Sequence, residues 1–470
     1  MLEHSLPYHH DSARLFAPLA HDNWAMLLDS GQALNPSTGQ PGSQYGRYDI
    51  IVAEPFATLV TSNGKTEVMH LGETQISREN SFALLKALLA KYPAAKSDAI
   101  FAGGALGYWG YDLARAEAHL PNRARTIPDM MVGLYDWAIV VDHHAKTCRL
   151  VSHGVLPQTR QNWHALKANL DAACSHAVLN LFSLKPFVVK GRANANFTQA
   201  DYHAAISRIH AYIRAGDCYQ VNLAQRFQAP VEGDAWTAYL KLRKISPAPF
   251  MAFMQLPDAA GGQFQVLSNS PERFLQTDGA YVETRPIKGT RPRDADRVRD
   301  AANAAELQQS LKDRAENLMI VDLLRNDIGK VCRTGSIRAD VLFELQSFAN
   351  VHHLVSIVTG NLKPDATAVS LLRACFPGGS ITGAPKLRAM QIIDELEPNT
   401  RGIYCGAIGY IGFDGKMDTN IAIRTAVVQN QQFTYYAGGG IVIDSEAENE
   451  YQETLNKAVS MERCLAAFTR

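Results

Sequence analysis

The stretch that decides the fold is GIYCGAIGYIGFDGKMDTNIAIRTAVVQNQQFTYYAGGGIVI, which occupies residues 402–443. It is rich in β-branched and aromatic residues, which are typical of strands, and glycines bound its apolar runs. The pattern predicts three successive strands, at residues 402–413, 420–428 and 432–443.

Helices are predicted on both sides of this stretch. A last helix is expected to begin near Ser445, because Ser445 and Glu448 have the spacing of a capping box, and to continue to about Phe468. Upstream, Thr198 can cap a helix that stops at Gly216. A further helix is indicated by an apolar stripe at three- and four-residue spacing, formed by Leu311, Ala315, Leu318, Val321, Leu324 and Ile328.

The N-terminal part of the chain is predicted to be rich in antiparallel strands. A helix at residues 82–91 interrupts them. The expected strands are residues 48–52, residues 101–109, and residues 131–141 paired with residues 147–152.

Residues 184–195 contain Pro186 and Gly191 and are predicted to link two regions of one compact globule. The first region is residues 1–185, which is strand-rich, and the second is residues 196–470. Because strands and helices do not alternate strictly, the fold class is expected to be α+β.

The composition is that of an ordinary globular protein. Lys plus Arg and Asp plus Glu both number 46, so the overall charge gives no indication of binding to nucleic acid or to an anionic membrane. The seven cysteines are scattered and never in C-x-x-C spacing, which favours reduced thiols. No signal peptide and no run of 18 apolar residues is recognised, so a cytoplasmic protein is expected.

Acidic side chains are placed so that two helices could offer carboxylates to one cleft. Asp313 and Glu316 lie on one helix, beside its apolar stripe. A face of the last helix carries Glu446, Glu450, Glu453 and Lys457. Such carboxylates would suit Mg²⁺, a hard ion with oxygen ligands, and the alternative is a solvated helix surface.

Two further features each have a functional and a structural interpretation. The glycines at 438–440 let backbone N–H groups approach an anion, or they allow a strand bulge or tight crossing. Lys288 lies between Pro286 and Gly289 in a basic segment. It is either a nucleophile with a lowered pKa or a surface lysine. Glu272 could act as a general acid, whereas His353 alone is more typical of a buried structural histidine.

Seven collinear motifs from about residue 200 onward resemble those of the chorismate-utilising enzymes. They are SNSPER (268–273), RPIKGTRPR (285–293), AENLMIVDLLRND (315–327), SITGAPK (380–386), IRT (423–425), GGG (438–440), and the Asp444-Ser445 pair leading to Glu453-Thr454. WAMLLDS (24–30) more loosely resembles the N-terminal region of anthranilate synthase component I. The resemblance implies a large two-subdomain α/β sandwich of two packed, mainly antiparallel sheets flanked by helices.

The residue at position 288 separates members of that family. Anthranilate synthases have alanine there, whereas lysine is found in the enzymes that aminate chorismate at C4. Isochorismate and salicylate synthases instead place a lysine at the position of Gln220. The resemblance therefore implies a C4-aminating enzyme that serves 4-aminobenzoate and folate synthesis.

The resemblance also implies a role for each site residue. Lys288 would attack C2 of chorismate while Glu272 protonates the leaving hydroxyl. Mg²⁺ would be held by Glu316 and Glu453, with Glu450 and Asp313 close by. The substrate would be contacted by Thr290, His353, Ser380, Tyr404, Arg424, Gly438, Gly440 and Lys457.

Nothing in the sequence resembles a glutaminase, so ammonia is expected from a separate glutamine amidotransferase subunit (component II). Three alternatives remain at this stage. They are an anthranilate synthase component I, a catalytically silent chorismate-binding homologue, and a pyridoxal-phosphate aminotransferase that uses Lys288. The last has no convincing phosphate-binding segment.

Overall fold

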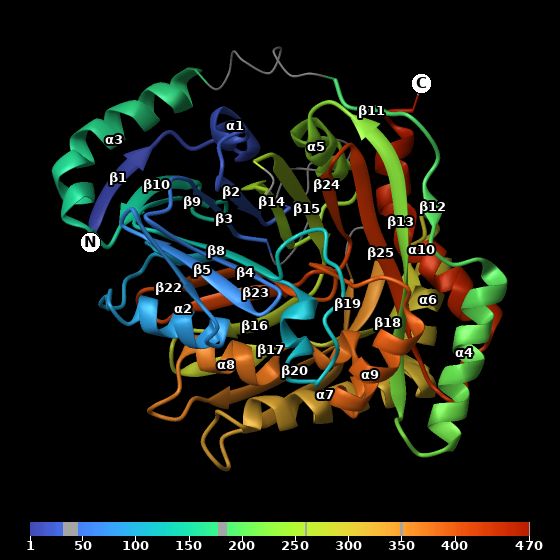
Figure 1. Cartoon of the computed structure of the whole chain (residues 1–470). Helices are drawn as coiled ribbons and strands as arrows, with labels where there is room; N and C mark the ends of the chain where they lie inside the picture. Colours follow the sequence, from blue (N-terminus) through green and yellow to red (C-terminus); the bar gives the residue numbers. More distant parts are fainter. Residues whose placement is uncertain (32–45, 177–185, 259–260, 348–350, 470) are drawn as a thin grey trace.

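The computed structural model describes residues 1–31, 46–176, 186–258, 261–347 and 351–469. Two large sheets pack face to face, and helices cover their outer faces (Figure 1). Every strand pairing within the two sheets is antiparallel, for instance β13 with β25 and β18 with β20. The predicted α+β class and the sandwich of two antiparallel sheets are confirmed.

The first sheet draws strands from both ends of the chain. Its order is β1 (Leu2–Leu6), β10 (Thr147–Ser152), β9 (Ala138–Asp142), β3 (Tyr48–Val52), β2 (Met26–Asp29), β14 (Phe250–Pro257), β15 (Gln263–Ser270), β24 (Thr425–Gln429), β25 (Gln432–Ile441), β13 (Gln220–Glu232) and β11 (Val188–Val189). Two short strands also pair with β13, namely β12 (Asn194–Ala195) and β21 (Gly383–Ala384).

The second sheet is built in the same mixed way. Its order is β18 (Ile287–Pro292), β20 (Val351–Asn361), β17 (Tyr281–Thr284), β16 (Arg273–Thr277), β23 (Met417–Ile421), β22 (Ala407–Gly412), β7 (Gly104–Trp109), β8 (Met130–Tyr135), β4 (Ala57–Ser62), β5 (Lys65–His70) and β6 (Glu73–Ser77), with β19 (Arg338–Ser347) beside β20. The N-terminal and C-terminal parts of the chain therefore share both sheets.

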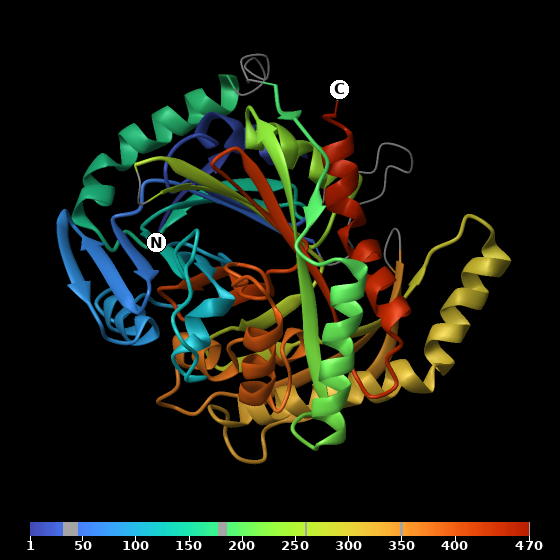
Figure 2. The ribbon, with the colours of Figure 1, turned by 45° about the vertical axis from the view of Figure 1, so that its right-hand side comes forward.

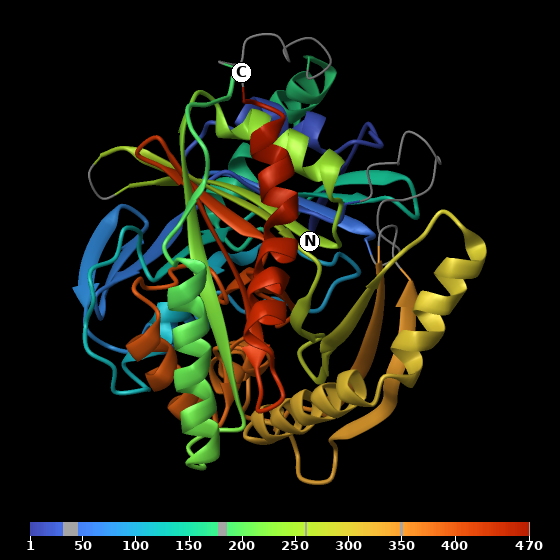
Figure 3. The ribbon, with the colours of Figure 1, turned by 90° about the vertical axis from the view of Figure 1, so that its right-hand side faces the viewer.

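The helices of the described residues are α1 (Ala13–Phe16), α2 (Ser81–Leu89), α3 (Pro157–His176), α4 (Gln199–Arg214), α5 (Ala235–Ile245), α6 (Arg297–Gln309), α7 (Leu311–Gly329), α8 (Ala368–Cys375), α9 (Lys386–Leu396) and α10 (Ala447–Ala466). Helix α10 packs on β25 and lies alongside α4 and α5 (Figure 3). Helix α7 packs on β20, whereas α6 projects from the body of the molecule (Figure 2).

The core has three main layers of apolar side chains. Between the sheets, Ile50 and Val266 of the first sheet meet Leu106 and Ile408 of the second. Outside the first sheet, α5 and α10 contribute residues such as Trp236 and Met461. Outside the second sheet, α2, α7 and α8 contribute Phe82, Val321 and Leu372. Burial on both faces explains why many of the strands read as continuous apolar runs.

The strand predicted over residues 420–428 is wrong in one informative respect. It is two strands, β23 in the second sheet and β24 in the first, separated by Arg424 with φ +51°. A second crossing between the same sheets joins β15 to β16 through Pro271 and Glu272. These two passages from sheet to sheet lie at neighbouring points.

The two crossings are hydrogen-bonded to each other. Ser270 Oγ donates to the Ile421 carbonyl at 2.6 Å, and the Ile421 amide donates to the Glu272 carbonyl at 3.0 Å. The Asn269 amide donates to the Arg424 carbonyl, also at 3.0 Å. These bonds fix Glu272 and Arg424 relative to one another.

Three other sequence expectations need correction. Residues 131–141 are two strands in different sheets, β8 and β9, and only β9 pairs with β10. The capping box of the last helix is absent, because Glu446 is the N-cap residue and Ser445 Oγ donates to Glu450 instead. The predicted apolar stripe of α7 is only partly buried. Leu311 is 80% exposed and Leu318 is exposed, and the buried face of the helix includes Ile320 and Val321 instead.

Other local expectations are confirmed. Strand β3 spans residues 48–52, and Thr198 caps α4 by accepting from the Asp201 amide at 3.1 Å. Gly216 follows the helix with φ +81°. Of the predicted linker, residues 184 and 185 lie outside the described residues. The remainder contains β11 and β12, so it forms part of the first sheet.

The described helices include none that is long and apolar enough to cross a membrane. Six cysteines of the described residues are buried: Cys148, Cys218, Cys332, Cys375, Cys405 and Cys464.

We expect Ser270→Ala to lower the free energy of unfolding by about 1–3 kcal/mol, because it leaves a buried carbonyl without its hydroxyl donor. Denaturant unfolding measures the change. Ser207→Ala is the matched control, since the exposed Ser207 hydroxyl only bonds the His203 carbonyl within α4, and its effect should stay within about 0.5 kcal/mol. Equal effects of the two substitutions would contradict the importance of the paired crossings.

Candidate functional site

The predicted site residues come from separate elements that meet beside the two crossings. The crossings provide Glu272 and Arg424, and β18 begins with Ile287 followed by Lys288. Helix α7 contributes Asp313 and Glu316, and α10 contributes Glu450, Glu453 and Lys457. The charge of Lys288 acts on Glu272, Glu316 and Glu453, which places this ammonium among the carboxylates of three elements.

The backbone around Lys288 is irregular. A bulge separates Lys288 from Thr290 in the pairing of β18 with β20, and Gly289 has φ +73°. A Cβ at Gly289 would lie 2.7 Å from Leu307 Cδ1 and 3.1 Å from Asp313 Cβ. The glycine therefore lets β18 approach the start of α7 closely. Lys288 is half-buried.

Glu272 is buried, with 8% of its surface exposed. Burial raises the pKa of this carboxyl to about 7, against the opposing effects of the Lys288 ammonium and of a hydrogen bond from Ser380 Oγ at 3.3 Å. Near neutral pH a large fraction of Glu272 therefore carries a proton. A buried carboxyl with this pKa can act as a general acid.

Three glutamates form the acidic part of the site. Burial raises the pKa of Glu316 and of Glu450, whose Oε1 accepts from Ser445 Oγ at 2.6 Å. Burial also acts to raise the pKa of Glu453, but the Lys457 ammonium, 2.5 Å from its Oε1, lowers it overall. Asp313 lies at the edge of this group and pairs with Arg291 at 3.2 Å.

These carboxylates provide the hard oxygen ligands that Mg²⁺ takes. Among the described residues, no three Asp, Glu, His or Cys side chains converge closely enough to hold a metal ion by themselves. Mg²⁺ does not need such a cage, because it usually keeps several waters and takes one or two carboxylates from the protein. Glu316, Glu450 and Glu453 fit that requirement, since they are close enough for the charge of Glu453 to raise the pKa of both others.

The triple glycine forms a tight crossing in β25, opposite residues 222–224 of β13. A Cβ at Gly439 would lie 3.0 Å from Glu450 Oε2, and one at Gly438 only 2.5 Å from the Leu223 carbonyl. Beyond Tyr435, β24 no longer pairs with β25, so alternate backbone groups on that side have no partner strand. Both sequence interpretations of the glycines are therefore compatible with the structure.

Cationic and neutral donors lie opposite the carboxylates. In the described part of the chain no carboxylate forms an ion pair with Arg424, and burial lowers the pKa of its guanidinium. Lys457 Nζ donates to the Gly438 carbonyl at 2.9 Å. Burial lowers the pKa of His353 to about 4, so its ring is neutral, and Nδ1 lies 2.9 Å from Thr290 Oγ1.

Two buried groups next to these residues were not among the predicted site residues, although Gln220 was named as a position that separates family members. Gln220 lies beside Gly440, and in the described structure its side-chain oxygen and nitrogen are both buried without a hydrogen-bond partner. Glu397 and Arg401 form a fully buried ion pair next to Tyr404. The acid and base stand four residues apart, which on sequence alone resembles an exposed helical pair, so no local signal marks them.

The family model described as chorismate binding enzyme matches residues 34–463. Aminodeoxychorismate synthase component 1 of Escherichia coli K12 is 45% identical over 463 residues, covering 96% of each chain. Anthranilate synthase component 1 of Pseudomonas putida is 37% identical over 456 residues, covering 94% of this chain and 91% of that protein.

A solved structure supports the same assignment. The crystal structure of anthranilate synthase component I from Streptococcus pneumoniae TIGR4 has a TM-score of 0.77 at 33% identity, covering 89% of this chain and 92% of that chain. The two-sheet fold, the gathering of the motif residues at its crossings and a match over most of the chain agree. The chain belongs to the chorismate-binding enzyme family.

Proposed function

We propose that this chain is an enzyme that aminates chorismate at C4, giving 4-amino-4-deoxychorismate, as the synthase component of an aminodeoxychorismate synthase. The observation that carries the proposal is the position of Lys288 beside the buried Glu272 carboxyl. The identity of 45% with aminodeoxychorismate synthase component 1 of Escherichia coli, over nearly the whole chain, supports it. The product supplies 4-aminobenzoate and folate synthesis.

The reaction is proposed to use two allylic displacements. The neutral Lys288 amine attacks C2 of the ring, the ring double bond shifts, and the C4–O bond breaks as Glu272 gives its proton to the departing hydroxyl. Ammonia then adds at C4, the double bond shifts back, and the C2–N bond to Lys288 breaks. A proton from the adding ammonia returns to Glu272, so the net change is the loss of one water and the gain of one amino group.

Chorismate carries two carboxylates, and the site offers a different environment for each. Arg424, without a carboxylate partner in the described structure, and the open amides beside Gly438 and Gly440 suit one of them. Tyr404, Ser380, Thr290, His353 and Lys457 are proposed to line the same pocket. Lys457 now pairs with Glu453, so its part is to balance charge as well as to orient the ring.

Mg²⁺ is the proposed cofactor, with Glu316 and Glu453 as its ligands and Glu450 and Asp313 nearby. When bound, the ion supplies positive charge that anchors a substrate carboxylate and stabilises charge in the transition state. The hydrogen bond from Ser445 holds Glu450 in place, and the ion pair with Lys457 holds Glu453. One carboxylate oxygen of each glutamate therefore faces the glycines of β25.

Ammonia is proposed to come from a separate glutamine amidotransferase subunit, consistent with the component naming of the relatives. Free ammonium at raised pH should replace that subunit in a test. Chorismate, Mg²⁺ and ammonium incubated with the purified chain should give 4-amino-4-deoxychorismate, identified by mass and ring substitution pattern. Anthranilate as the product would instead assign the chain to the other branch of the family.

Lys288→Ala should keep the fold and lower the rate of C4 amination by at least about 100-fold, because the covalent route is removed. Product analysis by chromatography should show either no amine or amination at a different ring carbon. Lys65→Ala, an exposed lysine on β5, is the matched control and should retain the parental product and rate. Parental C4 amination by Lys288→Ala would refute the covalent role.

Glu453→Gln should raise the Mg²⁺ concentration for half-maximal activity by about 10-fold or more, because one anionic ligand is lost. A titration of initial rate against Mg²⁺ measures this. Glu446→Gln, at the exposed N-cap of α10, is the control and should leave the titration unchanged. An unchanged titration for Glu453→Gln would remove it from the ligand set.

The raised pKa of Glu272 predicts a pH dependence of stability. A carboxyl whose folded pKa is about 7 favours folding in its protonated form, so this contribution is present below pH 4.5 and is lost as pH rises through about 7. Relative to Glu272→Gln, the parental unfolding free energy should fall by on the order of 3 kcal/mol between pH 4.5 and pH 8. Denaturant unfolding measures it, with the exposed Glu79→Gln as a control that follows the parental curve. Parallel curves for Glu272→Gln and the parent would show an ordinary carboxyl.

A further inference from the structure

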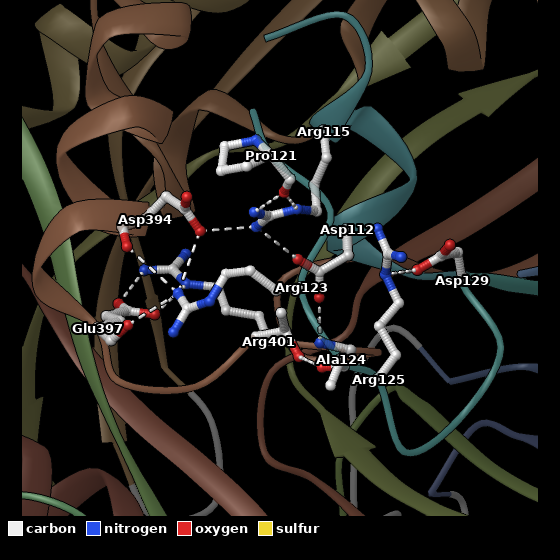
Figure 4. Close-up of polar contacts among 12 residues, drawn as sticks. Asp112, Arg115, Pro121, Arg123, Ala124, Arg125, Asp129, Asp394, Glu397 and Arg401 are labelled. Atoms are coloured by element: carbon white, nitrogen blue, oxygen red, sulfur yellow. Dashed lines mark hydrogen bonds and ion pairs between the residues drawn. The ribbon is translucent and has the colours of Figure 1, made fainter. Parts of the chain in front are cut away.

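We propose that Arg401 is a positioning residue, which holds the Ser380 loop, strand β13 and Tyr404 in the arrangement that the substrate site requires. The kinetic part of this inference rests on the proposed function, whereas the structural part does not. Through its pair with Glu397, Arg401 joins a network of charged residues between residues 112–129 and residues 394–402 (Figure 4).

The Arg401 guanidinium uses its donors on three different segments. With 1% of its side chain exposed, it forms a two-point pair with Glu397 at 2.6 and 2.9 Å. Its remaining donors reach the Ile381 carbonyl at 3.0 Å and the Asn222 carbonyl at 2.8 Å. The planar fork of arginine makes these bonds possible at the same time, and lysine cannot reproduce them.

The bond to Ile381 connects Arg401 with the general acid. Ile381 belongs to the short 3₁₀ turn of residues Gly379–Ile381, in which the Ser380 hydroxyl donates to Glu272. Anchoring the Ile381 carbonyl therefore fixes the turn from which Ser380 reaches the carboxyl. Loss of the anchor should move Ser380 and change the protonation of Glu272.

Strand β13 is held at two positions by the same ion pair. Arg401 bonds the Asn222 carbonyl, and Glu397 Oε1 accepts from the Ala224 amide at 2.9 Å. Asn222 pairs with Gly440 and Ala224 with Gly438. The pair thus fixes the strand against which the glycine crossing is built.

Aromatic rings complete the surroundings of Arg401. The guanidinium carbon lies 4.6 Å from the centre of the Tyr111 ring and 5.7 Å from that of Tyr404, and Tyr404 stacks on Tyr436 at 5.2 Å. These cation–π contacts set the plane of the Tyr404 ring beside Arg424.

Stability alone is a weak reason for this buried ion pair. Removing two charges from water is costly, and well-packed apolar residues often replace such a pair without loss of stability. Arg401 instead bonds the turn that carries Ser380 and the strand that pairs with the glycine crossing. The outer part of the network differs. Arg123 pairs with Asp394 at 3.1 Å and donates to the Glu397 carbonyl at 3.1 Å, and neither bond reaches the Ser380 turn or β13.

The test compares Arg401→Lys with Arg123→Gln. Arg401→Lys keeps a charge opposite Glu397 but loses the fork, so kcat for chorismate amination should fall by about 10- to 100-fold through misplacement of the reacting groups. Arg123→Gln should leave kcat within about twofold of the parent. If both variants fall equally, the network is only structural and the proposal is overturned.

A double substitution tests the route through Ser380. If Arg401 acts on Glu272 through this hydroxyl, adding Arg401→Lys to the Ser380→Ala variant should lower kcat by a clearly smaller factor than adding it to the parent. Equal slowing in the two backgrounds overturns this route. The pH profile of kcat/KM should also shift in Arg401→Lys and stay unchanged in Arg123→Gln.

Crystal structures of the parent and of Arg401→Lys separate this proposal from the proposed function. The variant should show the Ser380 turn and the Tyr404 ring displaced from their parental positions, whatever reaction the chain catalyses. Unchanged positions would overturn the positioning role even if chorismate is the substrate. If the parent consumes no chorismate, the function fails, and the crystal structures still decide the role of Arg401.

Discussion

The site depends on the hydrogen bonding between two neighbouring passages of the chain from one sheet to the other. At each passage the chain leaves the hydrogen-bonded pairing of its sheet. Backbone groups that lose their strand partner there form hydrogen bonds with the other passage, through Ser270, Ile421 and the Glu272 carbonyl. The side chains at the passages, Glu272 and Arg424, cannot enter either apolar face. The backbone bonds between the passages keep a carboxyl and a guanidinium close to each other, and we propose that both face the substrate.

Burial then gives these groups their chemistry. The same desolvation raises the pKa of Glu272 to about 7 and lowers that of His353 to about 4, so the pocket holds a proton donor beside a neutral imidazole. Lys288 stays close enough to oppose the shift of Glu272. In the proposed reaction the Glu272 carboxyl must carry a proton and the Lys288 amine must be neutral before the first displacement.

Local sequence patterns predicted the helices and strands that depend on interactions within a few residues. Thr198 caps α4 and residues 48–52 form β3, because capping and β propensity act within a few residues. The division at Arg424 was not predictable, since its positive φ is imposed by packing between sheets. The division of residues 131–141 has a similar cause. Asp136 leaves the strand to accept from the Val155 and Leu156 amides, which are distant in sequence. Motif order suggested the candidate site residues, and only the structure revealed the buried Arg401–Glu397 pair.

The negative charges of three glutamates are a physical reason to propose that a cation binds at this site. Glu316, Glu450 and Glu453 would repel a substrate that is itself a dianion, and Lys457 already neutralises one of them. Burial raises the pKa of Glu316 and Glu450, so their negative charge is costly in the free protein. The proposed Mg²⁺ relieves this cost and the repulsion together. Glu316 and Glu453 would hold the ion when it binds, and its positive charge would favour the binding of the chorismate carboxylate.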